Sequence, residues 1–202
     1  MKEKANIAVL VSGGGTNLQA ILDAEDSGII RSGEVMLVVS NNPDAYALTR
    51  AKNHNVETAV LSKKLCGGQE AFEDKLIGLL DEKEVDLIIL AGFMCILTKK
   101  FTDHFEKRII NVHPSLIPSF CGEGFYGLRV HEAALAKGVK VTGATVHYVN
   151  EIPDGGEIIA QKAVEILDGD TPEVLQKRVM EQAEWIILPA AAEKVCAEII
   201  SK

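Results

Sequence analysis

The sequence predicts an α/β fold: a Rossmann-like, mostly parallel twisted sheet flanked by helices, with a mixed C-terminal part. Two observations carry this prediction. Strand-length apolar segments alternate with segments whose apolar residues follow helical spacing, which is the pattern of a parallel sheet covered by helices. In addition, Ile7–Val11 and Leu87–Ala91 are apolar at every position, as expected of central strands covered on both faces.

The alternation places the first elements in order along the chain. Strands are expected over Ala5–Ser12, Glu34–Ser40, Thr58–Leu61, Val85–Ala91 and Ile109–Val112. Helices between them are expected over Asn17–Asp26, Asp44–Asn53 and Gln69–Glu82.

Beyond Pro118 the rhythm changes. A glycine-rich loop, a helix and two further strands are expected over Cys121–Gly127, Val130–Lys137, Val141–Val149 and Glu157–Glu165. Thr171 and Pro172 are typical of the N-cap and first turn of a long final helix, in which Pro189 is expected to cause a bend. No repeat, low-complexity tract or linker interrupts the 202 residues, so a single domain over 1–202 is expected.

The charge of the chain argues against nucleic acid as a partner. The chain has 21 Lys and Arg against 29 Asp and Glu, a net charge of −8, and no basic run that could neutralise phosphates. The apolar segment near the N-terminus is too short for a signal peptide, and no segment approaches the roughly 18 residues that span a bilayer. A cytoplasmic protein with no membrane partner is therefore expected.

The four cysteines indicate neither a zinc site nor a disulfide framework. They lie far apart and form no CxxC pair, which is typical of reduced thiols: Cys66, Cys95, Cys121 and Cys196. The histidines also lack metal-ligand spacing with supporting acids, so no metal is expected.

The glycine turn Ser12–Asn17 lies where the first strand ends and a helix begins. Backbone N–H groups and the helix dipole can hold a phosphate there, and glycines let the main chain approach it. Leu18 stands where a dinucleotide fingerprint needs a third glycine, so NAD binding is disfavoured. The alternative is a tight turn with Thr16 as N-cap. Ligands of open α/β sheets lie at this end of the strands, which favours the phosphate interpretation.

Asn111 and His113 are two residues apart at the end of a predicted strand, so they project to one side of the sheet. An amide can donate to a developing oxyanion, and an imidazole can supply charge or transfer a proton, which suits acyl chemistry. In the alternative interpretation, both side chains only satisfy loop backbone.

Asp154 lies in the segment Pro153–Gly156 between the last two predicted strands. Pro-Asp-Gly-Gly is also an ordinary turn sequence. A functional role requires Asp154 to lie near His113, where its charge would raise the pKa of the imidazole and fix its orientation.

The remaining histidines are weaker candidates. His54 and His104 are expected to be exposed on helices, and His131, near the start of a helix, is expected to be structural. His147 follows Thr145 by two residues in a strand, so it either lines the site or packs beneath it.

Four motifs give the chain a resemblance to a known family. They are Val11–Ala20 (VSGGGTNLQA), Leu90–Met94 (LAGFM), Ile110–Pro118 (INVHPSLIP) and Asp154–Gly156 (DGG). In this order, and over about Ile7 to Pro189, they resemble the folate-dependent formyltransferases, and within that family the glycinamide ribonucleotide transformylases. The Asn-x-His-Pro motif is shared by the whole family, and the glycine turn points to the ribonucleotide enzymes or a hydrolase relative.

The resemblance implies roles for individual residues. It makes Asn111, His113 and Asp154 the catalytic trio. It further implies that Gly15, Thr16, Asn17 and Glu184 bind the nucleotide, that Met94, Cys95, Ile96 and Leu97 form the folate pocket with the loop Asn150–Asp154, and that the Thr145 hydroxyl lies near the catalytic centre. Asn111 and Asp154 would therefore also contact the folate.

The implied reaction is formyl transfer from 10-formyltetrahydrofolate to the amine of glycinamide ribonucleotide, a step of purine biosynthesis. Both partners are small molecules, and the sequence is compatible with a homodimer without deciding the assembly. Asn111 and protonated His113 would stabilise the oxyanion of a tetrahedral intermediate, while Asp154 supports His113 and helps to move a proton, without a covalent enzyme intermediate.

Several positions depart from the family pattern. Cys95 stands where many members have Arg. Gln69 stands where many members have an Arg that reaches the glutamate tail of the folate. Pro153 replaces an aliphatic residue. One residue is inserted before Glu184.

Three alternatives remain. A formyltetrahydrofolate hydrolase normally carries an additional N-terminal domain, whereas only six residues precede Ile7. A methionyl-tRNA formyltransferase would need a C-terminal nucleic-acid-binding domain. A catalytically silent nucleotide-binding module would not need Asn111, His113 and Asp154 together.

Overall fold

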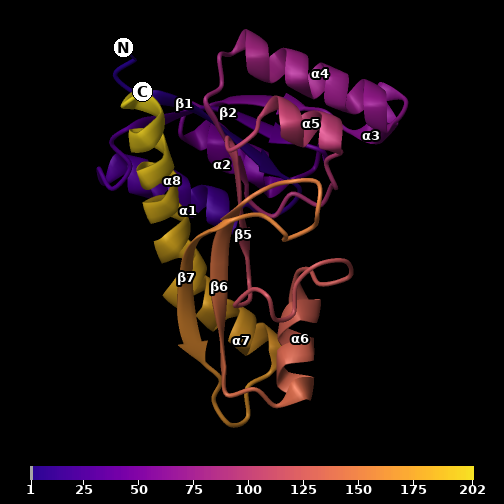
Figure 1. Cartoon of the computed structure of the whole chain (residues 1–202), viewed down its shortest axis with the longest axis vertical. Helices are drawn as coiled ribbons and strands as arrows, with labels where there is room; N and C mark the ends of the chain where they lie inside the picture. Colours follow the sequence, from indigo (N-terminus) through magenta and orange to yellow (C-terminus); the bar gives the residue numbers. More distant parts are fainter. Residues whose placement is uncertain (1) are drawn as a thin grey trace.

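A seven-stranded sheet in the order β3-β2-β1-β4-β5-β6-β7 forms the centre of the molecule, in a computed structural model that describes residues 2–202 (Figure 1). The first five strands run parallel: β1 Ala5–Val11, β2 Gly33–Ser40, β3 Glu57–Val60, β4 Leu87–Leu90 and β5 Ile109–His113. Strand β6 Val141–Tyr148 pairs antiparallel with β5, and β7 Ile158–Glu165 pairs antiparallel with β6. The prediction of a mostly parallel sheet with a mixed C-terminal part is therefore confirmed.

Helices cover both faces of the sheet. They are α1 Thr16–Asp26, α2 Tyr46–Asn53, α3 Lys63–Cys66, α4 Gln69–Glu82, α5 Lys99–His104, α6 Leu128–Lys137, α7 Pro172–Val179 and α8 Trp185–Ile200, with a π-helical turn at Met180–Glu184. Helix α8 lies beside α1 (Figure 1). Within residues 2–202, no helix is both long enough and apolar enough to cross a membrane.

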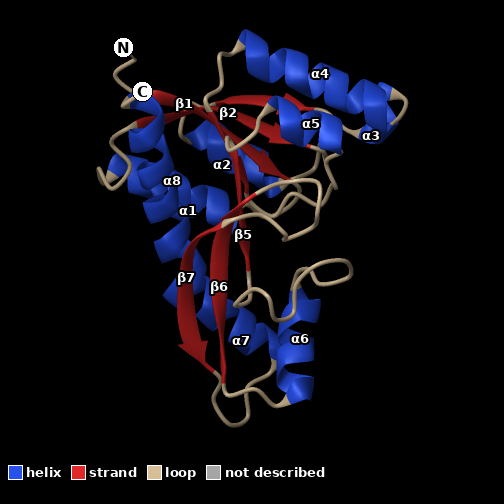
Figure 2. Cartoon of the chain, in the orientation of Figure 1, coloured by secondary structure: helices blue, strands red, loops and turns tan. Residues whose placement is uncertain are grey.

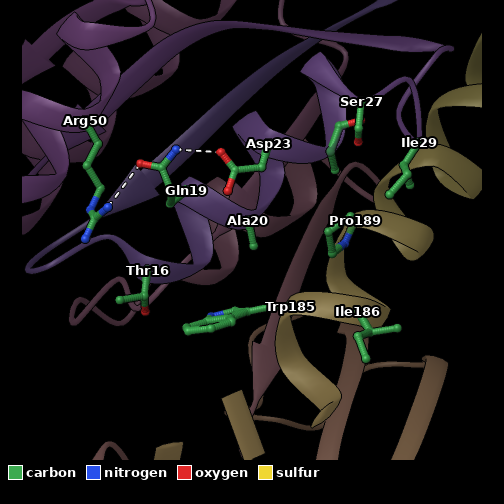
Figure 3. A pocket seen from close by; sticks show the side chains of 11 residues that line it. Thr16, Gln19, Ala20, Asp23, Ser27, Ile29, Arg50, Trp185, Ile186 and Pro189 are labelled. Carbon is green, nitrogen blue, oxygen red and sulfur yellow. Dashed lines mark hydrogen bonds between the residues drawn. The ribbon is translucent and has the colours of Figure 1, made fainter. Parts of the chain in front are cut away.

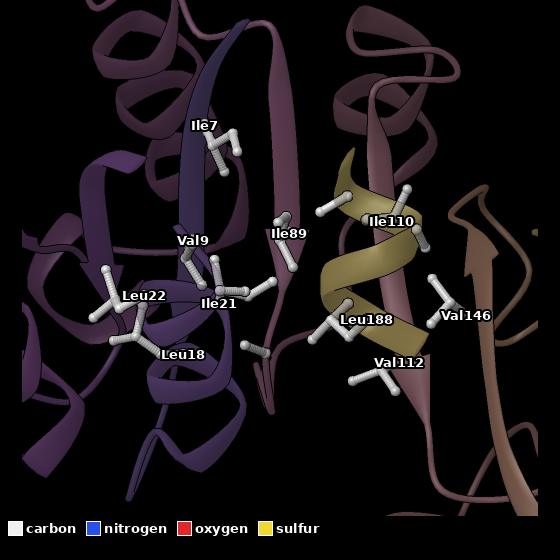
Figure 4. Packing of buried hydrophobic residues seen from close by; sticks show 14 of the residues in the cluster. Ile7, Val9, Leu18, Ile21, Leu22, Ile89, Ile110, Val112, Val146 and Leu188 are labelled. Carbon is white, nitrogen blue, oxygen red and sulfur yellow. The ribbon is translucent and has the colours of Figure 1, made fainter. Parts of the chain in front are cut away.

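The sheet separates two apolar layers. On one face, Leu18 and Ile21 of α1 and Leu188 of α8 pack against strand residues that include Ile89 (Figure 4). On the other face, Phe72 and other residues of α4 and α5 pack against Ile88 and its neighbours. Because consecutive strand residues point to opposite faces, the continuous apolar run of β4 fills both layers. Both β1 and β4 lie inside the sheet, as predicted.

The final helical segment begins as predicted but is irregular at a different place. The hydroxyl of Thr171 accepts a hydrogen bond from the Val174 N–H, and Pro172 occupies the first turn. A π-helical turn at Met180–Glu184 precedes α8, and α8 continues through Pro189, where the bend was expected. A π turn holds one more residue than an α turn.

The loops that follow the parallel strands gather at one end of the sheet. Figure 2 shows loops in tan between α5 and α6, and their colours in Figure 1 identify the loop after β5 and the loop between β6 and β7 among them. In parallel sheets this carboxyl edge is where ligands bind, so the fold places the candidate residues of several loops together.

Candidate active site

Strands β5 and β6 bring four polar side chains to one face of the sheet. Asn111 pairs with His147 across the two strands, and His113 pairs with Thr145. The pairing of β6 with β7 shifts register between Val146 and His147, and such bulges often re-aim a side chain beside an active site. His147, whose position the sequence left open, is 2% exposed and points into the site.

Asp154 completes this group from the loop between β6 and β7. Its Oδ2 lies 3.5 Å from His113 Nδ1, and its Oδ1 lies 3.5 Å from His147 Nε2. The backbone N–H of Gly122 donates to Oδ2 at 2.8 Å. The structure therefore brings Asp154 to His113, as the functional interpretation required, and adds His147 on its other side.

Burial and charge act in opposite directions on this group. Burial raises the pKa of Asp154, but His147, the charge of His113 and the Gly122 N–H together hold that pKa below its ordinary value. For His113, burial is the largest influence and lowers the pKa, while Asp154 and the Phe120 carbonyl raise it. The charge of Asp154 raises the pKa of His113, as expected. The net shift of that pKa is nevertheless downward, because desolvation of the imidazolium outweighs the charge of Asp154.

The loop after β5 covers His113. The His113 Nε2 lies 2.9 Å from the Phe120 carbonyl, to which it donates, and Phe120 adopts a positive φ of 50°. His113 is 4% exposed. Sequence reasoning identified this loop only by its glycines and did not predict that its backbone contacts both His113 and Asp154.

Thr145 secures the start of the same loop. Its hydroxyl donates to the Ser115 carbonyl at 2.7 Å and accepts from the Ile117 N–H at 3.1 Å and from the Gln161 amide at 3.0 Å. The hydroxyl lies near the catalytic group as the resemblance implies, but its hydrogen-bonding capacity is used by this loop.

A cavity of about 140 Å³ lies beside the group. Asn111, His147 and Asp154 supply polar atoms to its wall, and the rest of the lining is mostly apolar and includes Cys95, Ile96, Leu97, Asn150, Ile152 and Pro153. Met94 is not part of the lining and is 56% exposed. His113 is also absent from the lining, and its Nε2 is bound to the Phe120 carbonyl.

The glycine turn leads into α1 without a side-chain cap. Gly15 is the N-cap, with a left-handed φ of 72°, and Thr16 is the first helical residue. The alternative with Thr16 as N-cap is therefore wrong. A Cβ at Gly15 would lie 2.6 Å from the Cβ of Ala47, so only glycine fits there. The first N–H groups of a helix have no intrahelical partner, and here no side chain competes with an anion for them.

Two contacts connect the glycine turn to the rest of the site. The Ser12 hydroxyl accepts from the Met94 N–H at 2.8 Å, which joins the turn to the loop of the cavity. The Asn17 amide donates to Glu184 Oε2 at 2.7 Å. Glu184 is 6% exposed, and burial raises its pKa to about 7. Glu184, which the resemblance assigns to nucleotide binding, thus lies against the glycine turn.

A larger cavity, of about 430 Å³, lies on the other side of Thr16 between α1 and α8 (Figure 3). Its polar groups bind one another: Arg50 donates to Gln19 at 3.0 Å, and Gln19 donates to Asp23 at 2.8 Å. None of Asn111, His113 and Asp154 lines this cavity, so the smaller cavity is the candidate active site.

The other histidines lie outside the site. His104 is exposed and contacts Asp81, as expected of a solvated residue, whereas His54 is half-buried and contacts the Arg50 carbonyl. His131 is fully buried, and its pKa is lowered to about 4 by burial and by His113. Across the described part of the chain, no group of three or more His, Cys, Asp or Glu side chains is arranged to hold a metal ion.

Comparison with known proteins identifies relatives of the whole described fold. The family described as formyl transferase matches residues 5–191. A phosphoribosylglycinamide formyltransferase of Haemophilus influenzae is 44% identical over 183 residues, which is 91% of this chain and 83% of that protein. The human trifunctional purine biosynthetic protein adenosine-3 is 40% identical over 97% of this chain, which spans only 19% of that protein.

Solved structures agree with these relatives. The glycinamide ribonucleotide transformylase 1 of Symbiobacterium toebii superposes with a TM-score of 0.91 at 40% identity, covering 98% of this chain and 90% of that one. The phosphoribosylglycinamide formyltransferase of Brucella melitensis has a TM-score of 0.88 at 39% identity, covering 96% of both chains.

Proposed function

The chain belongs to the formyl transferase family, and from this membership we infer that it transfers the formyl group of 10-formyltetrahydrofolate to the amine of glycinamide ribonucleotide. The products are formylglycinamide ribonucleotide and tetrahydrofolate, in purine biosynthesis. Relatives that this chain matches over most of both lengths carry formyl transfer to phosphoribosylglycinamide in their names. The single observation that carries the proposal for this chain is that Asn111 and Asp154 line one cavity and that Asp154 lies 3.5 Å from His113 behind it.

We propose that the cavity receives the ring end of the folate. Its wall combines apolar side chains such as Leu97 and Ile152 with polar groups such as Asn111, a combination typical of sites that bind and orient a flat organic ring. At about 140 Å³ it is smaller than the roughly 300–1,000 Å³ of most ligand pockets, so the rest of the donor would extend outside. The exposed side chains of Met94, Ile96 and Ile152 lie in the segments around this opening and offer apolar surface to it.

The nucleotide would bind at the glycine turn. The uncapped N–H groups at Gly15, Thr16 and Asn17 suit a phosphate, which the helix dipole also favours. Glu184 lies beside Asn17 and offers a hydrogen-bonding carboxyl to a ribose hydroxyl. The contact between Ser12 and Met94 holds this turn next to the segment Met94–Leu97, which borders the cavity. The amine of the nucleotide would therefore arrive at the polar side of the cavity.

The trio would then perform the chemistry of an acyl transfer. The amine attacks the formyl carbon, and the Asn111 amide donates to the oxyanion that develops on the formyl oxygen. His113 rests in its neutral form at neutral pH because burial lowers its pKa. Asp154, which lines the cavity, would relay the proton that the amine loses to His113, which then carries the positive charge that stabilises the oxyanion. The proton would return to the folate nitrogen as the bond between that nitrogen and the formyl carbon breaks. Asp154 remains ionised beside it and stabilises that charge.

The proposal is tested with purified protein, 10-formyltetrahydrofolate and glycinamide ribonucleotide, by following loss of the formyl group from the folate. Turnover that requires the nucleotide and yields formylated nucleotide is the expected result. Equal turnover without the nucleotide would instead identify a hydrolase, and no turnover in either mixture would identify a silent binding module.

We also propose that the enzyme acts in the cytoplasm on these two small molecules, with no nucleic acid or membrane partner. The net charge of −8 supports this, because nucleic acids and most membrane surfaces are anionic. A homodimer is the assembly we propose to test, by light scattering across a range of protein concentrations; a mass of one chain throughout would reject it.

A further inference from the structure

We propose that His147 is a positioning residue for formyl transfer: it fixes the side-chain amide of Asn111 so that one amide N–H faces the cavity. This inference rests on the proposed function for its chemistry and on the geometry of β5 and β6 for its residues. Asn111 and His147 face each other across the two strands, and both line the cavity.

The contacts of His147 select one tautomer. Its Nδ1 lies 2.7 Å from the Tyr148 carbonyl, which can only accept a hydrogen bond. Nδ1 must therefore carry the proton. In the neutral imidazole, Nε2 is then a bare acceptor.

The backbone around Tyr148 holds this acceptor in place. The Tyr148 N–H donates to the Glu157 carbonyl at 2.8 Å. A Cβ on Gly156 would lie 1.7 Å from the Tyr148 oxygen, so the chain can approach this carbonyl closely only with glycine at 156. The second glycine of the Asp-Gly-Gly turn thus shapes the site without contacting a substrate.

The bare Nε2 determines the orientation of Asn111. The Asn111 Nδ2 lies 3.3 Å from Nε2, so it donates one of its two N–H groups to the imidazole. The reversed amide would place an oxygen against a nitrogen lone pair, which is repulsive. The second Nδ2–H is left without an assigned partner in the structure and is available to the oxyanion.

The structure favours His147 over His113 for this role. His147 lines the cavity with Asn111 and Asp154, whereas His113 is covered by the loop and donates to Phe120. Asp154 Oδ1 also lies 3.5 Å from His147 Nε2. The Asn111 Nδ2, at 3.3 Å, is the nearer of the two neighbours and is the one that donates to Nε2 in the neutral imidazole.

The test is a double-mutant cycle between positions 147 and 111. His147→Leu removes both nitrogens and keeps an apolar side chain, and His147→Gln returns an acceptor oxygen near the Nε2 position. We expect His147→Leu to lower kcat by about 100-fold with little change in either KM, as for other misplaced catalytic groups, and His147→Gln to recover most of that loss.

The informative variant combines His147→Leu with Asn111→Ala. If His147 acts through Asn111, the double variant turns over within about twofold of Asn111→Ala alone, the range expected of noise in additivity. Losses that multiply, or a loss confined to KM, would overturn the proposal. His104→Leu is the matched control, because His104 is exposed and lies outside the site; its kcat should be that of the unaltered chain.

A second measurement needs no variant and no activity. Nitrogen NMR of the ¹⁵N-histidine-labelled protein, assigned through the missing signal of His147→Gln, reports which imidazole nitrogen of His147 is protonated. A proton on Nδ1 with a bare Nε2 is expected, and the opposite tautomer rejects the inference even if His147→Leu does not fold. If the unaltered protein fails to formylate the nucleotide, the proposed function fails. The NMR measurement of the His147 tautomer still tests the hydrogen bond between His147 and Asn111 in that case.

Discussion

Glu184 is the residue whose environment most changes its chemistry. It is buried against Asn17, and burial raises its pKa from 4.5 to about 7. Between these two values the folded chain keeps the proton that the unfolded chain loses. The free energy of unfolding therefore falls as the pH rises through this window.

Replacing Glu184 by Gln should remove this fall in the free energy of unfolding with rising pH. The Gln oxygen can still accept from Asn17, so the variant should be more stable than the unaltered chain at pH 8, by up to about 3 kcal/mol, and equally stable near pH 4.5. Urea midpoints at the two pH values measure the difference. A gain of the same size at both pH values would show that titration of Glu184 is not the cause.

His113 and Asp154 should matter for turnover and little for folding. His113→Ala and Asp154→Asn each remove one group of the proton-transferring pair, and such groups are worth about 100- to 10,000-fold in rate. Steady-state assays of kcat, with circular dichroism to check folding, measure the effect. A rate near that of the unaltered protein in either variant would exclude the proposed role.

Element boundaries and turns are where sequence reasoning was strongest. The predicted strands and helices agree with the observed ones to within a few residues, because periodicity and capping act between near neighbours. The short helices α3 and α5 and the π turn at Met180–Glu184 were not predicted. The N-cap of α1 was predicted wrongly. Thr16 has the chemistry of a cap, but only the packing of Gly15 against Ala47 decides that the cap is glycine.

The two glycines of this turn make a matched pair of variants. Gly15→Ala places a Cβ 2.6 Å from Ala47 at a positive φ, whereas a Cβ on Gly14 meets nothing within 4 Å. We expect Gly15→Ala to lower the free energy of unfolding by about 1–3 kcal/mol and to raise the KM for the nucleotide. Gly14→Ala should change the free energy of unfolding, measured by urea titration, by no more than about 0.5 kcal/mol. Equal losses in the two variants would contradict the assigned geometry.

Strand β6 offers a second matched pair. The Thr145 hydroxyl makes three hydrogen bonds to the loop after β5 and to Gln161, whereas the buried Thr142 hydroxyl has no partner among residues 2–202. Thr145→Val should cost about 1–3 kcal/mol, because it leaves buried partners unpaired, and Thr142→Val should be neutral or stabilising. Urea unfolding of both variants measures the two changes in the free energy of unfolding. A larger loss in Thr142→Val than in Thr145→Val would show that the hydroxyl of Thr142 has a partner.

At the scale of the whole molecule, one sheet connects the two apolar layers. Ile88 and Ile89 of β4 belong to different layers although they are adjacent in sequence. We propose from this sharing that the chain unfolds as a single domain.

Ile89→Ala tests this proposal. The variant should lose about 2–5 kcal/mol of stability in one transition that is the same by far-ultraviolet circular dichroism and by fluorescence of Trp185, the single tryptophan. Trp185 begins α8 and reports on the C-terminal part of the chain. Two separate transitions, with only one moved by the substitution, would instead identify two domains.

The sequence by itself determined the fold class, the positions of most elements and the identity of the residues that meet at the site. Those properties depend on periodicity, turn chemistry and motifs within short stretches of chain. Only the tertiary structure decided that Asp154 lies between His113 and His147, that burial outweighs Asp154 in setting the pKa of His113, and that a π turn carries Glu184 to Asn17. Each of these depends on distances and desolvation between residues far apart in the chain, and no local pattern encodes either quantity.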